Sequence, residues 1–242
     1  MSDFYFIRHG QAGTRLEYDT LSLIGRQQAR LLGEYLAKQG IAFSKIIAGG
    51  LQRHRETAQS VLEAYKSDCV AVSDLVIDPE WNEFDLDAVY KSVAPLMSKD
   101  SAEFAASYAS MQQQVAEQGK LVDSVVNRRW NPCDGAVIKA WVTAQYPVEG
   151  QTWMAFRARI VGALTKLVGS NPDGNVAIFT SATPTAIALA QVMGLNERAL
   201  FSLAGVMINS SMSVLRSGDG DLRVFNFNTV PHLDDASLRT HR

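Results

Sequence analysis

The segment Arg8-His9-Gly10-Gln11 carries the first side chains that could do chemistry. It follows a short apolar run, residues 3–7, which predicts a buried strand that ends at a loop. Ligands bind at the carboxyl ends of strands in α/β proteins, so a guanidinium and an imidazole would meet there. A loop histidine that is only hydrogen-bonded is the alternative interpretation, and the motif needs support from the rest of the chain.

Strand and helix signals alternate around this motif. Apolar residues recur at helical spacing between Ser22, a start signal, and Gly40, a stop signal. Similar patterns predict further strands over residues 45–48, 175–180, 211–216 and 222–227, and further helices over residues 51–66, 152–168 and 184–193. The alternation predicts an α/β fold with a mainly parallel sheet sandwiched by helices.

Two regions depart from the alternation. The last two predicted strands flank Gly218-Asp219-Gly220, a hairpin signal, and should form an antiparallel C-terminal edge. Residues 85–144 are rich in Ala, Gln and Ser without a convincing strand, and they are broken near residues 131–135. We interpret them as a helical cap insertion in a single domain that spans residues 1–242.

Composition excludes several classes of protein. The 242 residues are 47% hydrophobic and 20% charged, which excludes disorder and a coiled coil. A net charge of -2 provides no global positive field for nucleic acid or an anionic membrane. Cys69 and Cys133 are far apart, and the first apolar run is too short for a signal segment or a membrane span. We therefore expect a cytoplasmic protein with neither nucleic acid nor membrane as a partner.

Four later segments add to the first motif. They are residues 19–29 (DTLSLIGRQQA), 50–58 (GLQRHRETA), 81–85 (WNEFD) and 149–159 (EGQTWMAFRAR). Together with Arg8-His9-Gly10 they resemble the histidine phosphatase superfamily, also called the phosphoglycerate mutase-like family. The resemblance extends from residue 4 to about residue 228 and so covers nearly the whole chain.

The resemblance implies phosphoryl transfer through a phosphohistidine. His9 would be the nucleophile, because a neutral imidazole can attack phosphorus in line. Arg8 and Arg53 would hold the phosphoryl oxygens with their guanidinium forks. Glu83 would protonate the leaving group and later act as a base for water. Gln11 is a further candidate for contact with the phosphate.

Two of these residues have simpler interpretations. Arg53 begins a predicted helix that also bears Arg55, and a solvated basic face is the alternative, which we prefer for Arg55 only. Glu83 lies in an acidic segment before a predicted helix, where carboxylates also suit the helix dipole. Trp81 and Phe84 could give Glu83 apolar walls, which favours the functional interpretation.

One element of the family pattern is missing. The superfamily places a second histidine at the end of a later strand, commonly within Ser-His-Gly-Gly. Here that strand is followed by Ser181-Ala182-Thr183-Pro184, and the register aligns Ser181, or after a slip of one residue Ala182, with the missing imidazole. We expect the Ser181 or Thr183 hydroxyl and the backbone amides of the next helix to bind phosphate instead. Losing one transition-state donor typically costs about 10²–10³ in rate, so a weakened enzyme is reasonable.

The other histidines offer poorer replacements. His54 follows Arg53 on one predicted helix and should point away at a large angle. His232 resembles a packing or closing element. The four histidines, including His9 and His241, lack metal-ligand spacing, so we expect no metal, no cofactor and activity that survives EDTA.

The leading hypothesis is a phosphomonoester hydrolase that acts on a small phosphorylated substrate. A phosphoglycerate mutase is the alternative within the same chemistry, and a non-catalytic phospho-ligand binder or scaffold is the alternative of another class. Specificity should come from the cap insertion, where Tyr90, Tyr108 and Arg128-Arg129-Trp130 are candidates for lining a mouth. The sequence leaves the oligomeric state open.

Overall fold

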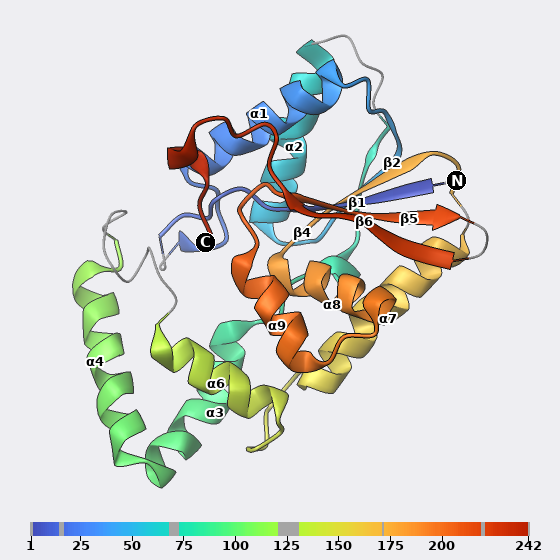
Figure 1. The fold of residues 1–242 in the computed structure, drawn as a ribbon. Helices are drawn as coiled ribbons and strands as arrows, with labels where there is room; N and C mark the ends of the chain where they lie inside the picture. The colour runs from blue at the N-terminus through green and yellow to red at the C-terminus, as the bar shows by residue number, and fades with distance from the viewer. Residues whose placement is uncertain are drawn as a thin grey trace. The chain divides into compact units, whose positions relative to one another are not determined.

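The computed structural model describes residues 2–14, 17–67, 73–120, 131–170, 172–218 and 221–241. These residues form a six-stranded sheet in the order β3-β2-β4-β1-β5-β6 (Figure 1). The strands are β1 (Ser2–Arg8), β2 (Phe43–Ala48), β3 (Leu75–Ile77), β4 (Asn175–Thr180), β5 (Met212–Gly218) and β6 (Asp221–Thr229). The first four strands in this order pair in parallel, whereas β5 pairs antiparallel with both β1 and β6. The predicted α/β sheet with an antiparallel C-terminal edge is confirmed.

Helices of unit 1 cover both faces of the sheet (Figure 1). The helices of the described residues are α1 (Leu23–Lys38), α2 (Gln52–Ser67), α3 (Leu86–Asp100), α4 (Ala102–Gln118), α6 (Pro132–Val142), α7 (Trp153–Gly169), α8 (Ala182–Met193) and α9 (Glu197–Val206). Short 3-10 turns add η2 (Pro79–Trp81) and η3 (Ala236–Leu238). Helices α1 and α2 lie on one face of the sheet, and α8 and α9 lie on the other (Figure 1).

Strand β3 and helix α9 were not predicted from the sequence. Strand β3 has three residues and forms an edge of the sheet, which is too short for a recognisable alternation. Helix α9 is also short, and it begins where the Asn196 side chain accepts a hydrogen bond from the Ala199 amide. A cap of this kind is a local signal that hydrophobic periodicity does not register.

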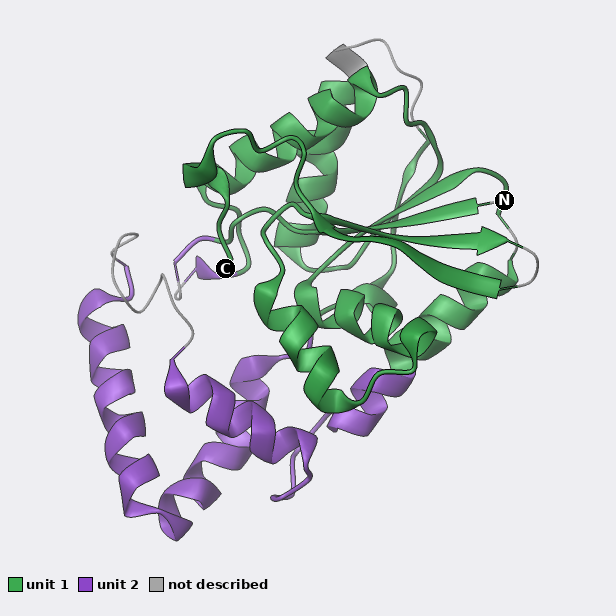
Figure 2. Ribbon diagram, in the orientation of Figure 1, with its two compact units in different colours: residues 1–12, 19–83, 159–242 green, residues 13–18, 84–158 purple. Residues whose placement is uncertain are grey.

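The chain divides into two compact units (Figure 2). Unit 1 comprises Met1–Ala12, Asp19–Glu83 and Arg159–Arg242 and carries the sheet. Unit 2 comprises Gly13–Tyr18 and Phe84–Ala158 and carries α3, α4, α6 and the first residues of α7. The predicted cap insertion over residues 85–144 lies within unit 2. The break expected near residues 131–135 is the start of α6, where Asn131 and Asp134 form a capping box.

The sheet is held by a core that includes strand and helix residues from unit 1. Strand β1 lies in the middle of the sheet, and its Phe4, Phe6 and Ile7 are fully buried. Residues of α1 and α2, among them Leu32 and Val61, pack on the same core as Ile7. Burying each large apolar side chain stabilises the fold by about 1.5–3 kcal/mol, so the end of β1 is held firmly.

The loop after β1 packs directly on the first turn of α1. Ser22 caps this helix by accepting a hydrogen bond from the Gly25 amide at 3.0 Å, as its predicted start requires. A Cβ at Gly10 would collide with the Gly25 carbonyl group, and a Cβ at Gly25 would collide with the Gln11 carbonyl oxygen. Two glycines therefore permit the close approach that fixes the loop bearing His9.

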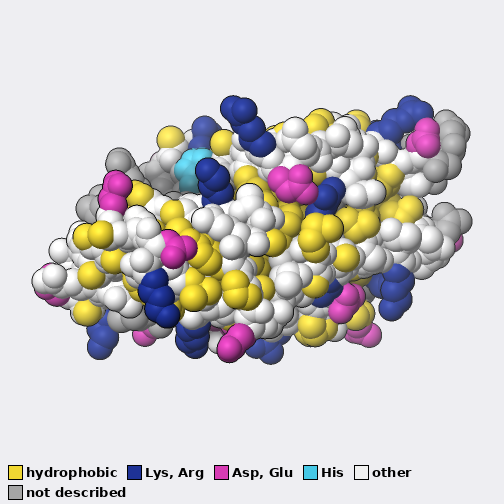
Figure 3. All heavy atoms as spheres, turned by 90° about the horizontal axis from the view of Figure 1, so that it is seen from below, with side chains coloured by type: hydrophobic (Ala, Val, Ile, Leu, Met, Phe, Trp, Pro, Cys, Tyr) yellow, Lys and Arg dark blue, Asp and Glu magenta, His cyan; other side chains and the backbone are white. Residues whose placement is uncertain are grey.

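In Figure 3, basic and acidic side chains are scattered among uncharged ones on the face shown, in keeping with a net charge of -2. Within the described parts of the chain, no helix is both long enough and apolar enough to cross a membrane.

Candidate active site

The predicted site residues of unit 1 gather at the carboxyl ends of β1 and β4. These strands are parallel, and Arg8 pairs with Thr180 in the last register position. The His9 amide continues the ladder by donating to the Thr180 carbonyl oxygen at 2.9 Å. His9 and Ser181 therefore leave neighbouring strands at the same edge of the sheet.

His9 is held as a neutral imidazole with one defined tautomer. Its side chain is buried, and its Nδ1 lies 2.7 Å from the Gly10 carbonyl oxygen. A carbonyl oxygen only accepts, so Nδ1 carries the proton and Nε2 carries the lone pair. Burial above all, and then the positive charges of Arg53 and Arg8, hold the pKa of His9 well below its usual value. The ring therefore presents an unprotonated nitrogen.

Arg8 is buried beside His9, and main-chain carbonyl groups hold its guanidinium. Nη1 donates to the Met207 carbonyl oxygen, and Nη2 donates to the His241 carbonyl oxygen at 3.0 Å. A guanidinium has five N–H donors, and these bonds use two of them. The bonds fix where the charge of Arg8 lies.

The segment that supplies the His241 carbonyl is tied to the loop of His9. The Gln28 amide nitrogen donates to the Leu238 carbonyl oxygen at 2.6 Å and to the Thr240 hydroxyl at 3.0 Å. The Gln28 carbonyl oxygen accepts from the Gln11 amide at 2.7 Å. One buried side chain therefore connects the first loop with residues 238–240. The sequence showed Gln28 within a family-like segment but gave no sign of this role.

Arg53 lies at the start of α2, close to the same imidazole. Its Nη1 is 3.0 Å from Asp19 Oδ1, and its side chain is 7% exposed, against 52% for Asp19. Thr57, one turn later, donates its hydroxyl to the Arg53 carbonyl oxygen and accepts from the Gly10 amide at 3.1 Å. Arg55 is exposed, as the solvated interpretation of that residue requires. The positive charges of Arg8 and Arg53 thus both act on the His9 imidazole.

Glu83 lies at the N-terminus of α8. Its Oε2 accepts a hydrogen bond from the Thr183 amide at 3.3 Å. The segment before it is clamped by Arg159, whose guanidinium donates to the carbonyl oxygens of Pro79, Glu80 and Asn82. The Glu83 carboxylate therefore accepts a hydrogen bond from one of the backbone amides of α8 that were expected to bind phosphate.

Ser181 is buried at the N-cap position of α8, but its side chain does not cap the helix. Instead, its Oγ lies 2.7 Å from Nε2 of His54. The hydroxyl is thus turned away from its own helix and toward an imidazole.

The prediction that His54 points away from the site was wrong. Its side chain is 0% exposed, and its ring centroid lies 5.7 Å from that of His9, with 30° between the ring planes. Arg53 and His54 are both buried because they occupy the first turn of α2, which lies against the strand ends. An angular separation around the helix therefore does not carry His54 into solvent.

Gln11 and His232 have other partners. Gln11 is half-buried, and its Oε1 accepts from the Ser22 hydroxyl at 2.7 Å, so a contact between Gln11 and phosphate stays a prediction. His232 is buried, and its Nε2 lies 2.8 Å from the hydroxyl of Ser210, whose amide donates to the His9 carbonyl oxygen. These contacts place His232 one residue away from the His9 loop, and its interpretation as a packing or closing element stays a prediction.

Three buried imidazoles make stability depend on pH. Burial lowers the pKa of His9 and of His54 well below the usual value, and that of His232 to about 4. Below about pH 6.5 the unfolded chain binds protons that the folded chain does not, so the free energy of unfolding falls by up to about 1.4 kcal/mol per pH unit for each such group. We expect urea unfolding to show a less stable protein at pH 5 than at pH 7.

A matched pair of variants isolates this effect. His232→Gln removes one buried imidazole and should reduce the loss of stability between pH 7 and pH 5. His241→Gln changes an exposed side chain and should leave that loss unchanged. Equal stability of the unmodified protein at both pH values would contradict the neutral assignment.

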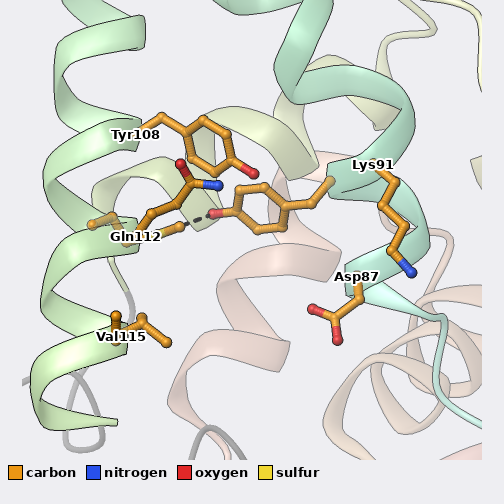
Figure 4. A pocket seen from close by; sticks show the side chains of 8 residues that line it. Asp87, Lys91, Tyr108, Gln112 and Val115 are labelled. Carbon is orange, nitrogen blue, oxygen red and sulfur yellow. Dashed lines mark hydrogen bonds between the residues drawn. The ribbon is translucent and has the colours of Figure 1, made fainter.

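Unit 2 holds a cavity of about 370 Å³ (Figure 4). Tyr90 from α3 and Tyr108 from α4 line it, with ring centroids 5.6 Å apart in a stacked arrangement. The Tyr90 hydroxyl donates to Asp134 Oδ1 at 2.6 Å. Both tyrosines thus line a cavity between two helices, whereas residues 128–130, the other mouth candidates, lie outside the described residues.

Across the described ranges, no three His, Cys, Asp or Glu side chains gather closely enough to hold a metal ion. Of the two cysteines, Cys133 is buried, and Cys69 lies outside the described residues.

Two of the known proteins that are similar to this chain in sequence are phosphatases by name. The chain is 24% identical over 182 residues to the serine/threonine-protein phosphatase Pgam5, mitochondrial, of Caenorhabditis elegans. The match covers 73% of this chain and 61% of that protein, so the chain spans less than two thirds of its length. It is also 36% identical over 76 residues to the broad-specificity phosphatase YOR283W of Saccharomyces cerevisiae, which is 28% of this chain and 33% of that protein.

A solved structure shows the same fold. YhfR from Bacillus stearothermophilus superposes with a TM-score of 0.63 at 17% identity, over 97% of this chain and 100% of that one. A sequence model of the histidine phosphatase superfamily (branch 1) matches residues 4–140 and 132–230. With this match over most of its length, the chain belongs to the histidine phosphatase superfamily.

Proposed function

We propose that this chain is a phosphomonoester hydrolase that works through a phosphohistidine at His9. The observation that carries the proposal is the state of His9, a buried neutral ring whose Nδ1 proton is bonded to the Gly10 carbonyl oxygen. Its other nitrogen has a lone pair, and the charges of Arg53 and Arg8 act on the same ring. A nucleophile and two cations are what attack on a phosphate dianion requires.

The first step transfers the phosphoryl group to the protein. His9 Nε2 attacks phosphorus in line, and the bond between phosphorus and the ester oxygen breaks. Arg8 and Arg53 stabilise the charge on the phosphoryl oxygens. Glu83 in its protonated form gives its proton to the departing alkoxide, which leaves as an alcohol.

The second step returns the protein to its starting state. The Glu83 carboxylate takes a proton from a water molecule, whose oxygen attacks phosphorus as the bond to Nε2 breaks. Orthophosphate leaves, Glu83 is again protonated, and His9 regains its lone pair. The cycle needs no cofactor. The names of the worm and yeast relatives describe phosphatases. This favours hydrolysis over the mutase alternative, in which the phosphoryl group would be transferred to a second substrate hydroxyl.

Trapping of the intermediate tests the proposal. The protein is mixed with para-nitrophenyl [³²P]phosphate and quenched in alkali within milliseconds. We expect label on the protein that survives alkali and is lost in acid, as a phosphoramidate should be. Binding of orthovanadate without any labelled protein would overturn the proposal and favour a non-catalytic phospho-ligand binder.

A further inference from the structure

We propose that His54 is a positioning residue that turns the Ser181 hydroxyl into a hydrogen-bond donor for the transferring phosphoryl group. The pair would take over the task that the family pattern assigns to a second histidine. The inference rests on the proposed hydrolase function and deepens it, since it names the group that would act where that pattern has an imidazole.

The geometry places the pair beside His9, the proposed nucleophile. Ser181 follows β4 at the register position next to His9, and its hydroxyl bonds to His54 Nε2 at 2.7 Å. The His54 ring lies beside the His9 ring, with 5.7 Å between centroids. Ser181 Oγ therefore lies within one hydrogen bond of a ring that neighbours the nucleophile.

The environment of His54 selects its tautomer. Its Nδ1 is buried without a hydrogen-bond partner among the described residues, and it lies so close to Gly49 that a Cβ there would collide with it. A proton on Nδ1 would be a buried donor without an acceptor, and an unsatisfied buried donor carries its full desolvation penalty. The proton therefore belongs on Nε2, which donates to Ser181 Oγ.

That tautomer decides what the Ser181 hydroxyl can do. A hydroxyl whose oxygen accepts from Nε2–H keeps its own proton for another acceptor. The hydroxyl does not cap α8, and in the described part of the chain no other acceptor takes its proton. A phosphoryl oxygen held by Arg8 and Arg53 is the acceptor that this arrangement fits. The hydrogen bond from the His54 imidazole also polarises the Ser181 hydroxyl. This makes the hydroxyl a stronger donor to the negative charge that develops on the phosphoryl oxygens.

The positions of the two residues also explain why His54 is buried at all. Neutral imidazole buried with one unpartnered nitrogen carries a desolvation cost that an apolar residue would avoid. The Ser181 hydroxyl, buried at an N-cap without capping, carries a similar cost. The bond between them satisfies one atom of each and leaves the Ser181 hydroxyl with one proton to donate.

Variants at the two positions test the inference through rates. Ser181→Ala should lower kcat for para-nitrophenyl phosphate and the rate of phosphoenzyme formation by about 10²-fold, with KM nearly unchanged, as expected for a donor to the transition state. His54→Leu, which keeps the volume but has no donor, should lower the same rates by about tenfold. His54→Gln retains an N–H donor and should recover most of that loss.

The double variant distinguishes positioning from a general effect on packing. Because His54 acts through Ser181, His54→Leu combined with Ser181→Ala should be no slower than Ser181→Ala alone. Losses that multiply would overturn the inference. Phosphoenzyme formation in folded His54→Leu at the rate of the unmodified protein would overturn it as well.

A measurement on the unmodified protein removes any dependence on variants that fail to fold. Nitrogen-15 NMR of the labelled imidazoles should show His54 protonated at Nε2. Protonation at Nδ1 would mean that the Ser181 proton is used within the pair, which overturns the inference. If no phosphoenzyme forms at His9 in the unmodified protein, the proposed function itself fails, and that outcome is distinct from all of these.

Discussion

Replacing His9 with alanine is expected to abolish hydrolysis of para-nitrophenyl phosphate. Removing a covalent nucleophile from an enzyme that depends on it costs of the order of 10⁶-fold in kcat. Here the loss should be near that limit, because the neighbouring imidazole of His54 has its Nε2 bonded to Ser181 and cannot attack in place of His9. Steady-state turnover and label on quenched protein should disappear together.

Controls for this variant address folding. His9 is buried, so alanine leaves a cavity, and His9→Gln provides a second variant that fills most of the volume. Both should retain cooperative urea unfolding. Arg55→Ala, an exposed change on α2, should turn over as the unmodified protein does. Undiminished hydrolysis by folded His9→Ala would show that the nucleophile is another group.

Replacing Arg53 with alanine is expected to lower kcat/KM by about 10²–10³-fold, the usual cost of one preorganised charge at a transition state. Arg53→Lys should recover only part of this, because an ammonium is a point charge without the planar fork of a guanidinium. The ion pair to Asp19 contributes little to stability, since Asp19 is 52% exposed. The defect should therefore appear in activity rather than in folding.

The same variant has a second readout. The charge of Arg53 is the largest electrostatic contribution that lowers the pKa of His9, after burial itself. Its removal should raise the pKa of His9, so the acid limb of the kcat/KM profile should move to higher pH. Arg55→Ala is the matched control and should change neither the rate nor the profile. Identical behaviour of the Arg53 and Arg55 variants would exclude a phosphate-binding role for Arg53.

Much of the fold could be predicted because its signals are local. Strand β4 contains a continuous apolar run over residues 176–179, and its predicted bounds, 175–180, match those observed. Helix α1 begins at the residue after its predicted cap, Ser22. Strand β3 has too few residues for a pattern, and its pairing with β2 depends on the rest of the sheet.

The candidate site was predictable in its residues but not in its connections. The family-like motifs contain His9, Arg53 and Glu83, and the strand order brings them to one edge of unit 1. The position of His54 could not be predicted from a helical projection, because burial of the first turn of α2 is a tertiary property. The bond between Arg8 and the His241 carbonyl joins residues 233 positions apart, and no sequence pattern indicates such a contact.

The bonds of Arg8 also have a consequence for the order in which the molecule is built. On the ribosome, Arg8 is synthesised 199 residues before Met207 and 233 residues before His241, whose carbonyl groups hold its guanidinium. A nascent chain that lacks these two residues carries Arg8 and His9 without the carbonyl groups that orient the guanidinium. The arrangement of Arg8 beside His9 is therefore completed only after residues 207 and 241 have been added.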